Sequence, residues 1–170
     1  MTLQLKSISL LQDQMTLERT NSMWYEGLSA AADVSDRHGA KAFFRASSKD
    51  ERGHAKRIKD FLVDIDATPV FAELPAIPTI DGSNYVGMFQ MALQREKVTT
   101  AALNALWAAA MDAGDAQAVA FIQNGGKDWL GFLLEQVEEE EQLSDYIARI
   151  QPLDANGINE FDHWLKKKYK

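Results

Sequence analysis

The chain has 170 residues, enough for one domain that buries roughly 70% of the surface its unfolded form exposes. Its 25 acidic and 18 basic residues give a net charge of −7, which argues against nucleic acid or an acidic membrane surface as a default partner. The absence of cysteine excludes disulfides and thiolate metal sites. We see no signal peptide and no stretch near the roughly 18 apolar residues of a membrane span, so we expect a cytoplasmic protein.

Four long segments have the periodicity of helices, and no strand-like alternation of useful length occurs. The predicted helices cover, in chain order, about residues 5–34, 40–66, 85–113, a region within 115–150, and a short amphipathic segment at 157–168. The first two are separated by a short connection, whereas the Pro-rich stretch 67–84 is long enough to carry the chain back along them. This order predicts one all-α domain over residues 1–170. It is a four-helix bundle (about 5–150) with one long crossover and a short fifth helix.

The fourth region contains an expected interruption. Asn124, Gly125 and Gly126 should break or kink a helix. We therefore expect a short extra helix near residues 115–123 and a fourth bundle helix that starts near Lys127.

Glu51 and His54 form a Glu-x-x-His step in the apolar stripe of the second helix. At about 100° per residue, Phe44, Ala55 and Ile58 fall within roughly 40° of Glu51, and His54 lies about 60° away. An uncompensated buried charge costs several kcal/mol, and residues three apart on one helix can reach the same metal ion. A single inward histidine is more often a hydrogen-bonded core residue than a ligand. The evidence for a metal site must therefore come from the other helices.

Each of the other three long helices also places a glutamate in its core stripe. These residues are Glu18, Glu96 and Glu139, with Glu135 about 40° to the side of Glu139 and Glu138 nearer the boundary. Structural ion pairs would be the alternative, but no lysine or arginine is expected to point inward at these positions. Converging carboxylates repel one another strongly, and cations relieve that repulsion. One histidine among oxygen ligands suits two divalent first-row ions, iron first among them.

In their order and spacing these residues resemble the non-haem bacterial and archaeal ferritins. The matching segments are Gln14-Met15-Thr16-Leu17-Glu18 with Tyr25, Asp50-Glu51-x-x-His54-Ala55, Glu96-Lys97-Val98-Thr99, and Glu135-Gln136-Val137-Glu138-Glu139-Glu140. Each segment is a weak signal alone, but the four in this order are highly specific. The resemblance covers nearly the whole chain, including the long crossover and the short fifth helix.

The resemblance implies a ferroxidase that oxidises Fe(II) with O2 and stores ferric mineral in a homo-oligomeric cage of 24 subunits. It implies two iron ions per subunit. One would be held by Glu18, Glu51 and His54, and the other by Glu51, Glu96 and Glu139, with Glu51 bridging the two.

Further residues match family positions around this centre. Gln136 would lie near the second iron, and Tyr25 would supply an electron or a hydrogen bond, although a core tyrosine with a satisfied hydroxyl is an equal interpretation. A possible third, looser iron site would use Asp50, Glu135 and Glu138, with Glu139 bridging to it.

Haem is not expected. Bacterioferritins carry a second Glu-x-x-His on the last bundle helix, whereas here Glu135 is followed by Glu138, and Arg52 stands where their haem-ligating methionine would be. In ferritins the end of the fourth helix lines the pores for iron. Since the chain is longer there, over residues 115–128, only Asp128 is a pore candidate and the assembly itself could differ.

Two other functions stay open at this point. One is a di-iron oxidase or oxygenase that acts on a small organic substrate and has no storage cavity. The other is a structural helical protein whose metal site only stabilises the fold.

Overall fold

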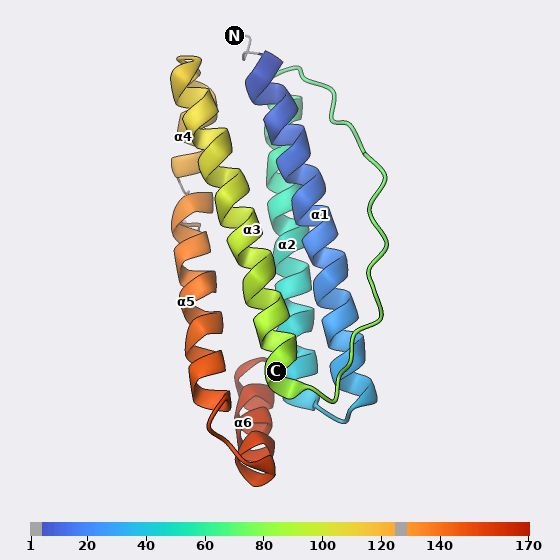
Figure 1. The fold of residues 1–170 in the computed structure, drawn as a ribbon. Coiled ribbons are helices and arrows are strands. Elements are labelled where there is room, and N and C mark those ends of the chain that lie inside the picture. The colour runs from blue at the N-terminus through green and yellow to red at the C-terminus, as the bar shows by residue number, and fades with distance from the viewer. Residues whose placement is uncertain (1–4, 125–128) are drawn as a thin grey trace.

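The computed structural model describes residues 5–124 and 129–170. It contains the helices α1 (Leu5–Val34), α2 (His38–Asp64), α3 (Tyr85–Asp112), α4 (Ala116–Gln123), α5 (Phe132–Ile150) and α6 (Ala155–Lys168). Helices α1, α2, α3 and α5 lie side by side as a bundle, with α6 at one end (Figure 1). The predicted all-α bundle with one long crossover and a fifth helix is confirmed. No helix in the described part of the chain is long and apolar enough to cross a membrane.

The crossover between α2 and α3 runs along the outside of the bundle beside α1 (Figure 1). Arg19 of α1 donates a hydrogen bond to the carbonyl of Ala72 at 3.3 Å. Near its end, a Cβ atom on Gly82 would lie 2.1 Å from the carbonyl oxygen of Ala31, so only glycine permits this approach. The side chain of Asn84 then caps α3 by accepting a hydrogen bond from the Gly87 amide at 3.0 Å. Because the crossover returns the chain along the bundle, α3 runs parallel to α2.

The core consists of two hydrophobic clusters at different levels of the bundle. The aromatic cluster, near α6, is built around Phe43, Phe44, Phe89, Tyr146 and Phe161. The aliphatic cluster, near the other end, is built around Leu11, Met15, Ile58, Leu103 and Leu106. Along α2, the residues that separate the two clusters include the predicted Glu-x-x-His step. A polar layer therefore lies between two apolar ones.

The interruption before α5 is longer than predicted. The short extra helix α4 forms as expected, but α5 begins at Phe132, not at Lys127. Gly131 has φ 93° and ψ 155°, a conformation that favours glycine and stops a helix from extending further back. Residues 125–128, including the second and third residues of the predicted break and the pore candidate Asp128, lie outside the described residues.

Candidate metal centre

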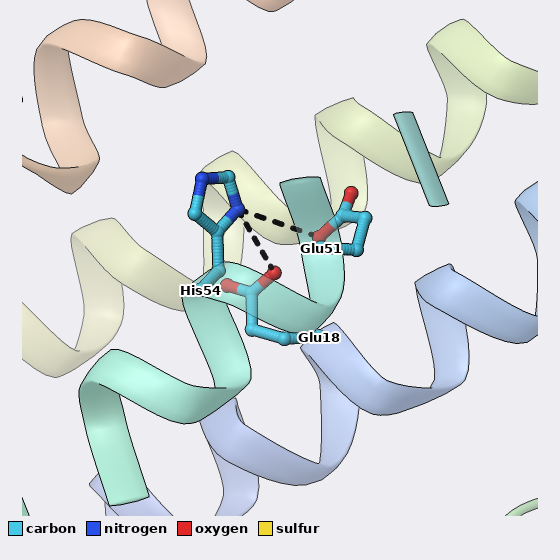
Figure 2. A group of neighbouring side chains, drawn as sticks. All are labelled: Glu18, Glu51 and His54. Atoms are coloured by element: carbon cyan, nitrogen blue, oxygen red, sulfur yellow. Dashed lines mark ion pairs between the residues drawn. The ribbon is translucent and has the colours of Figure 1, made fainter. Parts of the chain in front are cut away.

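The centre begins with three side chains from two helices. Glu18 on α1 faces Glu51 and His54 on α2, and all three are buried. The Nδ1 atom of His54 lies 3.5 Å from Oε2 of Glu51 and 3.8 Å from Oε2 of Glu18, and Figure 2 shows both carboxylates directed at this nitrogen. Ligand atoms from the three residues all lie within 4.8 Å of one another, close enough to share one metal ion. We call these residues the α1–α2 triad.

Helices α3 and α5 supply the opposite side of the centre. Tyr25 of α1 donates a hydrogen bond from its hydroxyl to Oε1 of Glu96. Gln136 of α5 donates to Oε2 of Glu139, and lies 3.3 Å from Oε2 of Glu96. The amide of Gln136 therefore ties the two carboxylates together across α3 and α5.

His54 also faces a second acidic group. Its Nε2 atom lies 3.3 Å from Oε2 of Glu135, so the imidazole stands between Glu135 on one side and the carboxylates of the α1–α2 triad on the other. Ligand atoms of His54, Glu135 and Glu139 also lie within 4.8 Å of one another. Every long helix of the bundle thus contributes a carboxylate within this one polar layer.

Two supporting contacts were not predicted from the sequence. Gln14 donates from Nε2 to Oε1 of Glu18 at 2.7 Å, and its position one turn before Glu18 on the inner face was the signal that could have found it. Trp129 donates from its indole nitrogen to Glu135. No sequence pattern predicts this contact of Trp129. The residue lies in the non-helical segment before α5, where no helical periodicity indicates the direction of a side chain.

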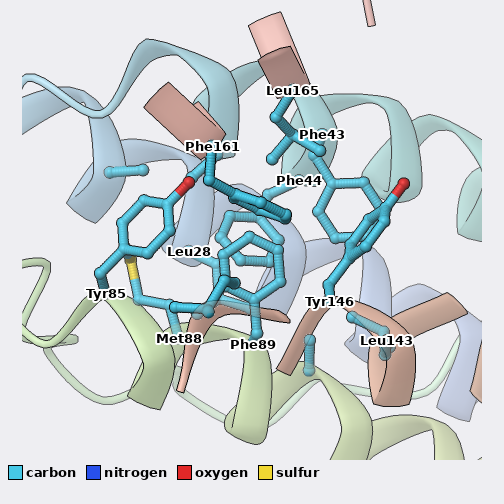
Figure 3. Packing of buried hydrophobic residues seen from close by; sticks show 14 of the residues in the cluster. Leu28, Phe43, Phe44, Tyr85, Met88, Phe89, Leu143, Tyr146, Phe161 and Leu165 are labelled. Carbon is cyan, nitrogen blue, oxygen red and sulfur yellow. The ribbon is translucent and has the colours of Figure 1, made fainter. Parts of the chain in front are cut away.

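Two of the predicted third-site residues lie apart from this cluster. Asp50 and Glu138 are exposed, and among the described residues neither belongs to a group close enough to share an ion. Asp50 does line a small cavity of about 70 Å³ that also contacts Glu51, Glu96 and Glu139. Phe43 and Leu143 of the aromatic cluster (Figure 3) border the same cavity. The carboxylates therefore have a narrow space beside them with an acidic residue on its wall.

Burial and close contacts shift the pKa values of the acids of the centre in different directions, depending on what surrounds each carboxyl. Burial, followed by repulsion from Glu18, raises the pKa of Glu51 well above its usual value. Burial and the charge of Glu96 raise the pKa of Glu139 to about 9. Burial acts against ionisation of Glu18 as well, but its close contacts with Glu51 and His54 outweigh burial and lower the pKa of Glu18. Without a cation, burial and mutual repulsion therefore oppose full ionisation of the carboxyl groups of the centre.

The donor set fits a divalent or trivalent metal ion. Oε2 of Glu18 and Oε2 of Glu51 are buried and have no hydrogen-bond partner among the described residues. In that part of the chain no lysine or arginine pairs with the glutamates of the centre, and their one ion-pair partner is His54. Carboxylate oxygens with a single imidazole nitrogen are ligands that iron and other first-row ions accept. An ion placed there would satisfy both unpaired oxygens and displace the protons that burial retains.

The amino-acid sequence of this chain is similar to those of several known proteins. The ferritin-like domain model matches residues 8–153. A bacterial non-heme ferritin of Escherichia coli O157:H7 is 30% identical over 155 residues, which are 88% of this chain and 86% of that protein. The chain belongs to the ferritin family. Another family member, the bacterial non-heme ferritin of Staphylococcus aureus strain NCTC 8325, is 30% identical over 154 residues, covering 89% of this chain and 87% of that one. The chloroplastic ferritin-2 of Vigna unguiculata is 26% identical over 167 residues, covering 94% of this chain and 64% of that protein.

Proposed function

We propose that this chain stores iron as other ferritins do. It would bind Fe(II) at the polar layer, oxidise it with O2, and hold the ferric product in a homo-oligomeric shell of 24 subunits. The observation that carries the proposal is the buried α1–α2 triad. Two of its carboxylate oxygens have no hydrogen-bond partner among the described residues and face one histidine nitrogen. Membership of the ferritin family supplies the choice of iron over other first-row ions.

The proposed ligands divide between two substrate ions. One Fe(II) would be held by Glu18, Glu51 and Nδ1 of His54, and the other by Glu51, Glu96 and Glu139. Glu51 would bridge them, because it lies in the α1–α2 triad and also lines the cavity shared with Glu96 and Glu139. Two adjacent ions can each give one electron to O2, which neither does as readily alone.

Other side chains would orient these ligands. The Tyr25 hydroxyl and the Gln136 amide each donate to Glu96, and Gln136 also fixes Glu139. These neutral donors hold the carboxylates in place without competing for their charge. The carboxylic protons retained at Glu51 and Glu139 would leave when the ions bind, so iron uptake should release protons.

A third, looser iron position would use Asp50, Glu135 and Glu138, with Glu139 bridging to the centre. Asp50 supports the proposal because its carboxyl lies on the wall of the cavity beside Glu51 and Glu139. Glu135 belongs to the group that also contains Glu139, so an ion could pass between them.

The size of the cavity favours metal ions and O2 over an organic substrate. Small-molecule sites in proteins typically occupy about 300–1,000 Å³. The cavity beside the carboxylates measures about 70 Å³, well below that range, so it suits metal ions and O2 better than a substrate with a carbon skeleton. This observation argues against the di-iron oxygenase alternative.

The experiment that tests the proposal is aerobic Fe(II) loading of the purified protein, then size-exclusion chromatography with iron counted per chain. We expect a particle of roughly 450 kDa, which corresponds to 24 copies of the 19.0 kDa chain. It should carry far more iron than the roughly three ions per chain that the proposed carboxylate sites could hold. Iron that saturates at two or three per chain on a small species would overturn storage. A stable metal-loaded species that consumes no O2 would instead indicate a purely structural metal.

A further inference from the structure

A strongly basic groove lies between α2 and the C-terminal end of the chain. It has a volume of about 710 Å³ and is formed by one face of α2 and the C-terminal end of the chain. Six of its lining residues are lysine or arginine, and no acidic residue lines it: Lys41, Arg45, Lys49, Arg52, Lys166 and Lys170. We call this the basic groove.

The concentration of charge is unexpected for this protein. The chain has 18 basic residues and a net charge of −7, yet six of those 18 line one groove. On α2 the basic residues recur every three or four positions, from Lys41 to Arg52, so they share one helix face. Lys166 and Lys170 approach the same groove from a segment more than a hundred residues away in sequence.

Most of these cations have no acidic partner within the described part of the chain. Lys41 pairs with Asp33 at 2.8 Å and Arg52 with Glu26 at 2.6 Å, both toward α1. No ion pair of Arg45, Lys49, Lys166 or Lys170 occurs among the described residues, and all four side chains are exposed. Like charges held this close repel one another, and an anion with several negative charges would relieve that repulsion.

The shape of the groove suits a compact anion. Ala42 and Ala46 lie between the basic positions of α2 and leave room above the helix, while Tyr169 forms part of the wall. The Tyr169 hydroxyl is held by Gln142, to which it donates at 3.2 Å, and by Tyr146 at 3.1 Å, so this wall is anchored to α5. The volume falls within the range of small-molecule sites.

We infer that the basic groove binds a multivalent phosphate anion of the oligophosphate class. Arginine forks match phosphate oxygens in pairs, and lysines act on them as mobile point charges, so this set can surround a chain of phosphate groups. Tyr169 and Ala46 also line the small cavity of the metal centre, which places the anion beside that centre. Binding of the anion in the basic groove requires no iron at the metal centre. An extended nucleic acid is disfavoured, since the rest of this acidic protein would repel it.

The test uses the full-length, metal-free protein and sodium tripolyphosphate as the probe, with binding measured by titration calorimetry at about 0.15 M salt. We expect the double variant Arg45→Gln/Lys49→Gln to bind at least about 10-fold more weakly, because each lost cation removes a phosphate contact. Lys56→Gln is the matched control. Lys56 lies on the same helix, outside the groove, and its change should leave affinity unaltered.

Thermal unfolding of both variants checks that they fold. No binding by the parent protein, or an equal loss in Lys56→Gln, would overturn the inference. Tighter binding of a short DNA duplex than of tripolyphosphate would overturn it in favour of nucleic acid. Affinity for tripolyphosphate that survives in Lys166→Gln as well as in the double variant would show that the anion binds elsewhere.

Discussion

His54 is held between two acidic groups, with its Nε2 atom 3.3 Å from Glu135 and its Nδ1 atom facing Glu51 and Glu18. An imidazole that donates its Nε2 proton to a carboxylate presents Nδ1 as a lone pair, which is the form that binds metal. Glu135 in turn accepts a hydrogen bond from Trp129. Glu135 is therefore placed to orient the histidine of the candidate metal centre, and we expect it to favour the tautomer with the proton on Nε2 when metal binds.

Glu135→Gln should weaken metal binding without unfolding the protein. Loss of such a supporting partner typically lowers metal affinity or activity by about 10–100-fold. Fe(II) oxidation monitored by ferric absorbance, together with Zn(II) affinity, would measure it. Glu141→Gln is the control, since Glu141 is an exposed glutamate on the same helix. Equal rates in the two variants would show that Glu135 does not support His54.

Loss of a residue of the α1–α2 triad should have a larger effect. We expect Glu51→Ala or His54→Ala to slow Fe(II) oxidation by at least about 10-fold, because each removes a direct ligand from the proposed site. Assembly should persist, since both side chains lie in the polar layer and not on the surface. Stopped-flow oxidation and size-exclusion chromatography would test the two statements separately. Unchanged oxidation in both variants would refute the ligand assignment.

The metal-free protein should lose stability as the pH rises. Burial raises the pKa of Glu139 from 4.5 to about 9, so between these values the folded state binds more protons than the unfolded state and stability falls with pH. His54 acts in the same direction: although burial opposes it, contacts with Glu135, Glu18 and Glu51 raise its pKa. Its contribution to stability is full below about 6.5 and is lost as the pH rises through the raised pKa of the folded state. The carboxyls with lowered pKa, such as Glu18, act the other way but only below about 4.5.

We therefore expect a lower melting temperature at pH 8.5 than at pH 5.5 for the metal-free protein, measured by calorimetry in chelator. Glu139→Gln should flatten this dependence, because its amide does not titrate. Bound metal should also flatten it by displacing the same protons. A melting temperature that climbs over this pH interval would contradict the charge assignments.

The packing of α6 on α2 allows no added atom at Gly39. A Cβ there would lie 1.9 Å from the carbonyl oxygen of Asp162, whose carboxylate also accepts hydrogen bonds from the Gly39 and Ala40 amides at 2.9 Å. We expect Gly39→Ala to destabilise the fold by about 1–3 kcal/mol, as overpacking does. Gly53→Ala is the control: its added Cβ meets nothing within 4 Å, and replacing a mid-helix glycine should stabilise by up to about 1 kcal/mol. Denaturant unfolding would measure both, and equal effects would refute the close contact.

The sequence by itself determined which residues face inward. Whether a side chain on a helix points to the core depends on its angular position relative to neighbours on the same helix, which is local information. Glu18, Glu51, Glu96 and Glu139 were assigned to the interior on that ground, and each lies in the polar layer of the bundle. The long crossover could also be predicted from the sequence, because its prolines rule out a helix there.

Only the tertiary structure decided which inward residues meet. That Glu135 contacts His54, that Gln136 joins Glu96 to Glu139, and that Trp129 reaches Glu135 all depend on the relative height of two helices and on side-chain rotamers. Neither quantity is encoded by spacing along one helix. The start of α5 at Phe132 followed from the backbone of Gly131, and the basic groove from the meeting of α2 with the distant C-terminal end. Helical periodicity determines which side chains share one face of a helix. Which faces meet depends on how the helices of the whole chain pack together.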